Sequence, residues 1–117
     1  MTIARESIHR IGFEGVATGR RLSSVHPGEV LVKDFIEPLG LTRYKVAKAI
    51  KVQQRRIDEI CRGERAITAD TALRLAKLFG LDAQVWMNLQ AQYDLETAAR
   101  RLSKRIDRDV TPIPRAA

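Results

Sequence analysis

The sequence predicts an all-α fold of five helices, and three observations indicate it. Apolar side chains recur at helical intervals through most of the chain after residue 25. Capping or turn residues precede the predicted helices, and Gly or Pro follows most of them. No segment shows the alternation expected of a convincing strand. The 117 residues suffice for one small domain with a single core, and a second, catalytic domain has no room.

The first predicted helix follows a turn at residues 26–29, where Glu29 lies near the positive N-terminal end of the helix. Residues 38–40, Pro-Leu-Gly, end it. Its expected buried stripe consists of Val30, Leu31, Phe35 and Ile36. The preceding residues 1–24 show no sustained period and weak caps, which predicts an irregular or partly disordered arm.

Residues 42–63 predict two short helices joined by a tight turn, a helix-turn-helix. Thr42 is placed to cap the first of them with its hydroxyl. The small Ala47 is expected where the two helices cross, with Ile57 filling the crossing from the other side. The second helix should run from about residue 53 to 62, with Gly63 in a left-handed C-terminal position. The apolar positions behind this prediction are Val46, Ala47, Ile50, Val52, Ile57 and Ile60.

After a loop at residues 64–67, two further helices complete the prediction. Thr68 should cap the fourth helix, Asp70 should complement its dipole, and Gly80 should end it. Its expected inward face consists of Ala72, Leu73, Leu75, Ala76 and Phe79. Asp82 should cap a fifth helix that extends towards Ile106, before the sequence Thr-Pro-Ile-Pro at 111–114 forbids more helix. We therefore expect a domain over residues 25–106 and a tail over 107–117.

Positive charge is concentrated on the predicted helix-turn-helix. The chain has a formal net charge of +7, and residues 43–65 hold eight Lys and Arg against three Asp and Glu. Such a surplus favours a polyanionic partner, and on this motif it predicts that the second helix enters a DNA major groove. A solvated charge run is the alternative interpretation.

Several other classes of protein are disfavoured. No apolar run approaches the roughly 18 residues of a membrane helix, the single Cys61 cannot form an internal disulfide, and the N-terminus lacks a secretory signature. We therefore expect a cytoplasmic protein without a membrane association. His9 and His26 lie far apart without a plausible nucleophile or carboxylate pair, and Cys61 has no metal-spaced companion. We expect no enzyme, no metal and no cofactor, with Cys61 as packing filler.

Five ordered blocks of the sequence resemble a known family. They are HPGEVL at 26–31, EPLGLT at 37–42, RRIDEI at 55–60, GERAITADTA at 63–72, and FG at 79–80 with WMNLQ at 86–90. Over roughly residues 25–97 the chain is similar to the HigA-type antitoxins of the lambda-repressor-like class. The resemblance implies a repressor encoded beside a HigB-type toxin, a ribosome-dependent mRNA endonuclease. It also implies neutralisation of that toxin and dimeric binding to an operator that represses the operon. The residues themselves support only the DNA half.

Candidate DNA contacts follow from the coincidence of motif and charge. The N-terminal half of the second motif helix, together with one residue a turn later, supplies the base-contacting candidates, which are Gln53, Gln54, Arg55, Arg56 and Glu59. Both ends of the motif supply phosphate-contacting candidates, which are Thr42, Arg43, Tyr44, Arg62 and Arg65. Arg56 could equally reach a phosphate, and two adjacent arginines can also merely solubilise a helix.

Two positions depart from the family pattern. Many helix-turn-helix sequences have Gly at the turn, where this chain has Lys51, and a left-handed backbone there costs a non-Gly residue on the order of 1 kcal/mol. Residues 53 and 54 are glutamines where relatives often begin the helix with Pro, which exchanges pre-organisation for hydrogen-bonding groups.

One short recognition helix buries too little surface for high specificity, so we expect a homodimer that reads two half-sites. The fifth helix is the expected dimer element, through Trp86, Leu89 and Tyr93. These residues could instead all serve the intramolecular core. Two other functions also stay open: a stand-alone repressor without a toxin partner, and an RNA-binding or scaffold module.

Overall fold

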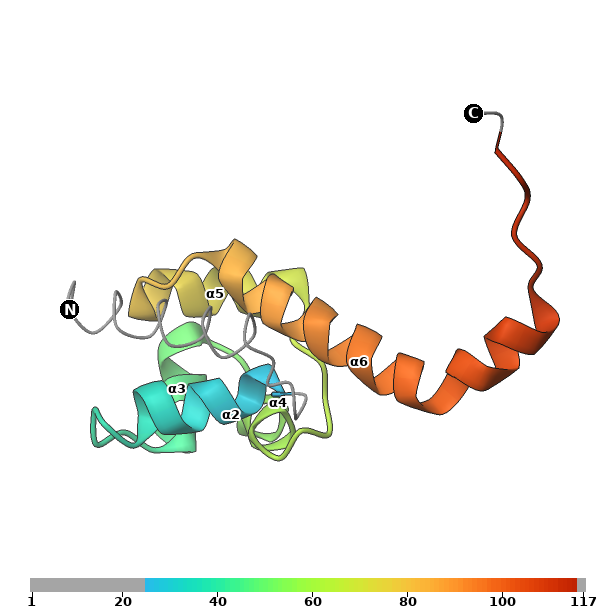
Figure 1. Cartoon of the computed structure of the whole chain (residues 1–117). Coiled ribbons are helices and arrows are strands. Elements are labelled where there is room, and N and C mark those ends of the chain that lie inside the picture. The colour runs from blue at the N-terminus through green and yellow to red at the C-terminus, as the bar shows by residue number, and fades with distance from the viewer. Residues whose placement is uncertain (1–24, 116–117) are drawn as a thin grey trace.

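The computed structural model describes residues 25–115, and every regular element in that range is helical (Figure 1). The elements are α2 (Pro27–Val30), η1 (Leu31–Ile36), α3 (Arg43–Ile50), α4 (Gln54–Cys61), α5 (Ala69–Phe79) and α6 (Ala83–Asp109). Because η1, a π-helix, directly continues α2, the described residues form five helices in all. The predicted all-α fold is confirmed. The predicted arm at residues 1–24 lies outside the described residues.

The first helix begins at a histidine cap. The Nδ1 atom of His26 accepts a hydrogen bond of 2.9 Å from the backbone N–H of Gly28, so the turn predicted here is an N-cap formed by the His26 side chain. The wider π-type turns of η1 were not predicted. They are visible in the 2.9 Å hydrogen bond from the Glu37 N–H to the Val32 carbonyl.

Gly28 marks the closest approach between the first helix and α4. A Cβ atom built on Gly28 would lie 1.8 Å from the carbonyl oxygen of Ile60, which is far inside van der Waals contact. Only a residue without a side chain fits here, and this absence lets the start of α2 pack directly against the backbone of α4.

The crossing of α3 and α4 confirms the predicted helix-turn-helix. Ala47 and Ile57 are both buried where α3 packs on α4. The Thr42 hydroxyl caps α3 by accepting a 3.0 Å bond from the Lys45 N–H. Lys51 has φ 63° and ψ 46°, the left-handed conformation predicted for the turn, and among the described residues it is the one non-glycine with positive φ.

The core lies between the first helix, the motif, α5 and the first half of α6. Phe35 packs on Phe79 and on Trp86, with ring centroids 4.6 Å and 5.6 Å apart. One feature differs from the prediction, and another was not predicted. Leu73 is 64% exposed, because it lies about 100° around the helix from the buried Ala72 and so leaves the inward face. Gln90 is buried among apolar residues.

Gln90 is buried because its side chain supports the loop before α5. Its Oε1 atom accepts a 2.7 Å hydrogen bond from the backbone N–H of Ile67, and its Nε2 atom donates to Asp94 Oδ1 at 3.0 Å. Ile67 is itself buried, so the Gln90 amide satisfies a backbone donor that water cannot reach. The amide thereby joins α6 to the segment that follows α4.

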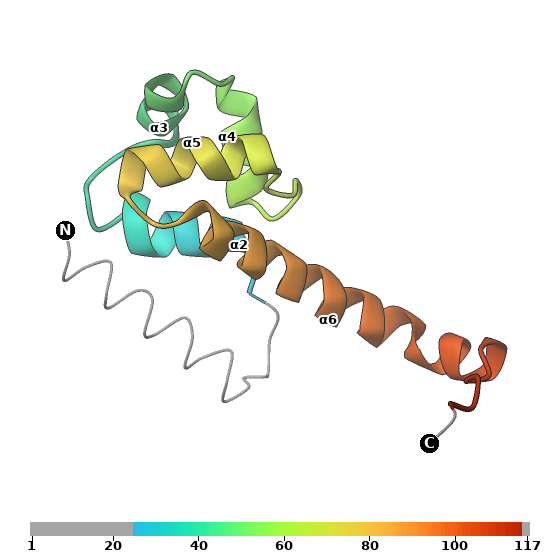
Figure 2. The ribbon, with the colours of Figure 1, turned by 90° about the horizontal axis from the view of Figure 1, so that it is seen from above.

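Helix α6 is much longer than the others. Its 27 residues span about 40 Å, and in both views its C-terminal half extends away from the remaining helices (Figures 1 and 2). It ends at Asp109, beyond the predicted end near Ile106, just before the predicted Thr-Pro stop. Asp82 and Thr68 occupy the predicted N-cap positions of α6 and α5, but neither side chain forms a capping hydrogen bond. No helix within residues 25–115 combines the length and apolar character needed to cross a bilayer.

Candidate nucleic-acid interface

The N-terminal half of α4 presents an exposed polar surface. Gln53 is the N-cap residue of α4, and it is exposed together with Gln54 and Arg55. Ile57 and Ile60 face the opposite way and are fully buried. The burial of this inner face fixes α4 on the core, so the outer face is held in a defined orientation.

A carboxylate ties two arginines together on the outer face of α4. Glu59 Oε2 accepts a 3.0 Å bond from Arg55 Nε, and Glu59 Oε1 accepts a 2.8 Å bond from Arg65 Nε. These two hydrogen bonds hold the pKa of the Glu59 carboxyl below its usual value. Glu59, predicted as a base reader, therefore already has both oxygens engaged.

Arg56 turns away from the outer face. Its Nη1 atom donates to Asp70 Oδ2 at 2.9 Å and to the hydroxyl of the buried Thr71 at 3.3 Å. The prediction that Arg56 reads a base or reaches a phosphate stays untested: in the free protein the acceptors at the start of α5 hold the guanidinium, and its side chain is 32% exposed. Arg56 links α4 to α5.

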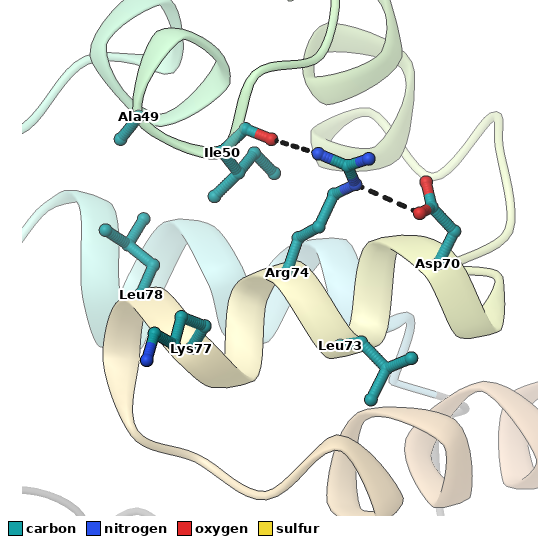
Figure 3. A pocket seen from close by; sticks show the side chains of 7 residues that line it. All are labelled: Ala49, Ile50, Asp70, Leu73, Arg74, Lys77 and Leu78. Carbon is teal, nitrogen blue, oxygen red and sulfur yellow. Dashed lines mark hydrogen bonds and ion pairs between the residues drawn. The ribbon is translucent and has the colours of Figure 1, made fainter.

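A second arginine, on α5, joins that helix to the end of α3, as Figure 3 shows. Arg74 donates from Nε to Asp70 Oδ1 at 3.0 Å and from Nη1 to the carbonyl oxygen of Ile50 at 2.7 Å. Ile50 is the last residue of α3, so Arg74 satisfies a carbonyl at the entrance to the motif turn. Hydrogen bonds from Arg56 and Arg74 hold the pKa of Asp70 below its usual value. This role of Arg74 was not predicted, although the spacing of Asp70 and Arg74 fits an i,i+4 ion pair.

The predicted phosphate contacts at the start of α3 lie together with an additional lysine. Tyr44 is exposed, and Lys48 lies beside it, with Nζ 3.4 Å from the Tyr44 hydroxyl and 5.6 Å from the ring centroid. Arg43 lies 3.8 Å from Asp58 of α4. The hydroxyl of Thr42 accepts the capping bond, so its O–H proton can still be donated to an anion that meets the first-turn backbone N–H groups of α3. Lys48 was not predicted as a contact residue.

The predicted contacts after α4 are both paired with acidic residues. Arg62 Nε lies 3.2 Å from Glu64 Oε1, and Arg65 is bound to Glu59 as described above. All these side chains are exposed or half-buried, where ion pairs contribute little to stability, and both contacts use only the Nε atom of the arginine. The arginines therefore remain able to meet phosphates.

The three predicted dimer residues lie in different surroundings. Trp86 is fully buried in the core of its own chain, so its side chain has no surface to offer a second copy, and its assignment to a dimer interface is wrong. Leu89 is half-buried against the same core. Tyr93 is half-buried and packs edge-on against His26, with ring centroids 4.8 Å apart. Further along α6, Leu95 is 69% exposed.

Cys61 and His26 occupy structural positions. Cys61 lies half-buried near the end of α4, packed against the core, where burial raises the pKa of its thiol. A thiol that keeps its proton is a poor nucleophile, which agrees with the packing role predicted for it. Burial also lowers the pKa of His26, the cap of α2. Neighbouring acidic residues and the backbone of Arg65 oppose this shift without reversing it.

Comparison with known proteins identifies the family. A helix-turn-helix family model matches residues 32–86. Virulence-associated protein I of Dichelobacter nodosus is 51% identical over 77 residues, which are 66% of this chain and 71% of that protein. Antitoxin HigA-1 of Vibrio cholerae is 36% identical over 78 residues, which are 67% of this chain and 71% of the antitoxin.

A solved structure agrees with these relatives. The Pseudomonas aeruginosa antitoxin HigA, determined with the higBA promoter, superimposes with a TM-score of 0.76 at 37% sequence identity. The match covers 79% of this chain and all of the other. Fold, motif and sequence identity agree, and the chain belongs to the HigA-type antitoxin family of helix-turn-helix proteins, which are not enzymes.

Proposed function

We propose that this protein is an antitoxin that binds operator DNA as a dimer, represses its own operon, and neutralises a HigB-type toxin that cleaves mRNA on the ribosome. The observation that supports the DNA half best is the outer face of α4, where Gln53, Gln54 and Arg55 are exposed on a helix anchored by buried isoleucines. Pseudomonas aeruginosa HigA, a relative with this fold, was solved with promoter DNA. Operator binding would place the protein in the cytoplasm.

In this proposal α4 lies in the major groove. Glutamine can pair with adenine N6 and N7, and arginine with guanine O6 and N7, so Gln53, Gln54 and Arg55 are the base readers. Contacts to phosphates flank them, from the start of α3 and from the segment after α4, and they fix the register of the protein on the duplex. The phosphate contacts are Thr42, Arg43 and Tyr44 on one side and Arg62 and Arg65 on the other.

The test compares Arg55→Ala with Arg65→Ala on two duplexes. One duplex is selected by the wild-type protein from a randomised pool, and the other is a scrambled sequence of the same length and composition. Arg55→Ala should weaken binding to the selected duplex by about 1–3 kcal/mol and relax preference at one base pair. Arg65→Ala should weaken binding to both duplexes alike and reduce the salt slope by about one.

The two variants act as controls for each other, since each removes one guanidinium from the same side of the motif. Equal losses on selected and scrambled DNA for Arg55→Ala would refute its assignment as a base reader. A loss confined to the selected duplex for Arg65→Ala would refute its assignment to a phosphate.

Dimerisation through α6 is the second part of the proposal. The projecting half of α6 carries an apolar stripe at helical spacing, Leu95, Leu102 and Ile106, and Leu95 and Ile106 are exposed. Together with Leu89 and Tyr93 it would provide a surface for a second copy, which the buried Trp86 cannot. Sedimentation of the wild type at micromolar concentration should show a dimer, and Leu95→Glu should shift it towards monomer. A wild-type monomer would contradict this part.

The toxin half needs a different experiment. The net charge of +7 does not favour a basic toxin, so local acidic residues would have to supply the contact. Co-expression with the product of the neighbouring gene should give a stable complex and restore growth. A stand-alone repressor would bind the selected duplex but rescue no growth. Structured RNA bound as tightly as the selected duplex would instead favour an RNA-binding module.

A further inference from the structure

We propose that Glu59 is a positioning residue, which fixes Arg55 and Arg65 in the free protein so that operator selectivity depends on this carboxylate. The inference rests on the proposed role of Arg55 as a base reader. It replaces the prediction that Glu59 itself contacts a base.

The Glu59 carboxylate is bonded to both arginines. One oxygen accepts from Arg55 at 3.0 Å and the other from Arg65 at 2.8 Å, so the two arginines share one acceptor group. The Glu59 side chain is 20% exposed, whereas that of Arg55 is 80% exposed. The carboxylate therefore supports the arginine that reaches outward and does not itself reach as far.

The arginine atoms that would meet DNA are not the ones that Glu59 holds. Both bonds to Glu59 use the Nε atom of the arginine. The terminal nitrogens, Nη1 and Nη2, form the end of the guanidinium fork, and the Nε bonds to Glu59 do not use them. Two parallel N–H donors of that kind match guanine O6 and N7, or two oxygens of a phosphate. Glu59 thus orients the arginines without consuming the donors that DNA needs.

The two arginines come from different segments of the chain. Arg55 lies in the first turn of α4, and Arg65 lies in the loop after α4 ends. Arginine side chains have many rotamers, and ordering them on binding reduces affinity. Because Glu59 fixes both before binding, a base reader and a phosphate contact keep one relative placement, which favours a single register on the duplex.

Because Glu59 is negatively charged, the direction in which its removal changes DNA affinity and selectivity tests this inference. Its pKa is lowered by the two arginines, so the carboxylate stays ionised at neutral pH and repels phosphates. If Glu59 acted through charge alone, its removal would strengthen binding to every duplex. Under the proposal its removal strengthens binding to scrambled DNA but lowers the preference for the selected duplex.

The experiment measures affinities of the full chain for the selected and scrambled duplexes described above. Glu59→Gln should lower the ratio of the two affinities about tenfold, the coupling expected of side chains in direct contact. The matched control is Glu64→Gln, which removes the same charge from the pair with Arg62. It should strengthen binding to both duplexes and leave their ratio unchanged.

Two further variants separate positioning from a general structural role. Glu59→Asp keeps the charge but shortens the side chain, so it should lower the affinity ratio without strengthening binding to scrambled DNA. In an Arg55→Ala background, Glu59→Gln should leave the ratio unchanged, because Arg55, the base reader of its two partners, is gone and the phosphate contact Arg65 acts alike on both duplexes. Thermal unfolding of each single variant should stay close to wild type, since the ion pairs of Glu59 are with exposed arginines on the surface.

The outcomes distinguish the inference from the proposed function. If Arg55→Ala leaves the affinity ratio unchanged, the reader assignment and the inference both fail. If Arg55→Ala lowers the ratio and Glu59→Gln does not, the inference alone fails. Equal effects of Glu59→Gln and Glu64→Gln on the ratio, or additive losses in the double variant, would also overturn it.

Discussion

Each of the two faces of α4 carries an arginine, and the two arginines have different partners. Arg55 and Arg56 are neighbours in the sequence, yet the first points outward and lies on Glu59, while the second points inward to Asp70 and Thr71. One residue turns the helix by about 100°, which separates them onto different faces. The chemistry of the two guanidiniums is the same, so their surroundings alone decide their roles.

The packed face of α4 determines its position, and the open face carries the proposed base readers. The packed face, which includes Ile57, Ile60 and Arg56, determines where α4 lies relative to the first helix and α5. The open face determines what α4 can bind. Changes to the packed face and to the turns around it should therefore alter stability, whereas changes to the open face should alter DNA selectivity and leave unfolding nearly unchanged.

The largest expected effect is that of Gly28→Ala at the packed face. The new Cβ would lie 1.8 Å from the Ile60 carbonyl oxygen, so the first helix and α4 must move apart. We expect the free energy of unfolding, measured by urea denaturation, to fall by about 3 kcal/mol. Alanine otherwise favours helices over glycine, so the sign isolates the steric conflict.

Gly40→Ala is the matched control for this change. Gly40 has φ +65°, and a Cβ added there would meet nothing within 4 Å, so only the backbone conformation resists the substitution. It should reduce stability by about 1–2 kcal/mol. A smaller loss for Gly28→Ala than for Gly40→Ala would contradict the tight contact between the first helix and α4.

Arg56→Ala tests the link between α4 and α5 and should have the next largest effect. It removes both bonds that Arg56 makes at the start of α5 and leaves Asp70 with Arg74 alone. Thermal unfolding should occur at a lower temperature than in the wild type. The neighbouring Arg55→Ala, which removes the same group from the open face, should leave the Tm close to wild type. A larger fall in Tm for Arg55→Ala than for Arg56→Ala would contradict the assignment of Arg56 to the packed face and Arg55 to the open face.

The histidine cap should make stability depend on pH. Burial lowers the pKa of His26 in the folded state, so below the unfolded value of 6.5 the unfolded chain binds a proton more readily. Stability should therefore fall as the pH drops below about 6.5 and stay level above it. Protonation of Nδ1 adds to the fall because it removes the acceptor for the Gly28 N–H. Urea denaturation between pH about 5 and 8 measures this.

His26→Asn is the control for the pH dependence. Asparagine supplies a side-chain oxygen for the same cap but does not titrate in this range. In this variant the part of the fall in stability that His26 causes below pH 6.5, the ordinary pKa of histidine, should be absent. An unchanged decline would show that another group causes it.

The smallest expected effect is that of Lys51→Gly at the turn into α4. Lys51 has φ 63°, so glycine relieves a left-handed conformation and should raise the free energy of unfolding by about 1 kcal/mol or less. Lys51→Ala removes the same charge but keeps the strained backbone, and it should give no increase. Urea denaturation of both variants measures the difference. Equal stabilities would mean that the turn stores no strain.

Local patterns in the sequence determined most of the fold. The helical spacing of Ala47, Ile57 and the other apolar residues predicted the motif, and Thr42, Lys51 and Gly63 marked its cap, turn and end, all of which the structure confirms. These features depend on neighbours within one or two turns of helix, so the chain itself encodes them. The family resemblance, which the comparisons confirm, added what local patterns do not contain.

The tertiary structure alone decided the roles of individual side chains. Arg56, Glu59, Trp86 and Gln90 each find their partners across the fold or on another segment, and the sequence contains no distance between such segments. Trp86 left the predicted dimer surface because the first helix covers it, and Gln90 entered the core because a buried backbone N–H needed an acceptor. Spacing predicts which face of a helix a residue occupies, but only packing determines what that face meets.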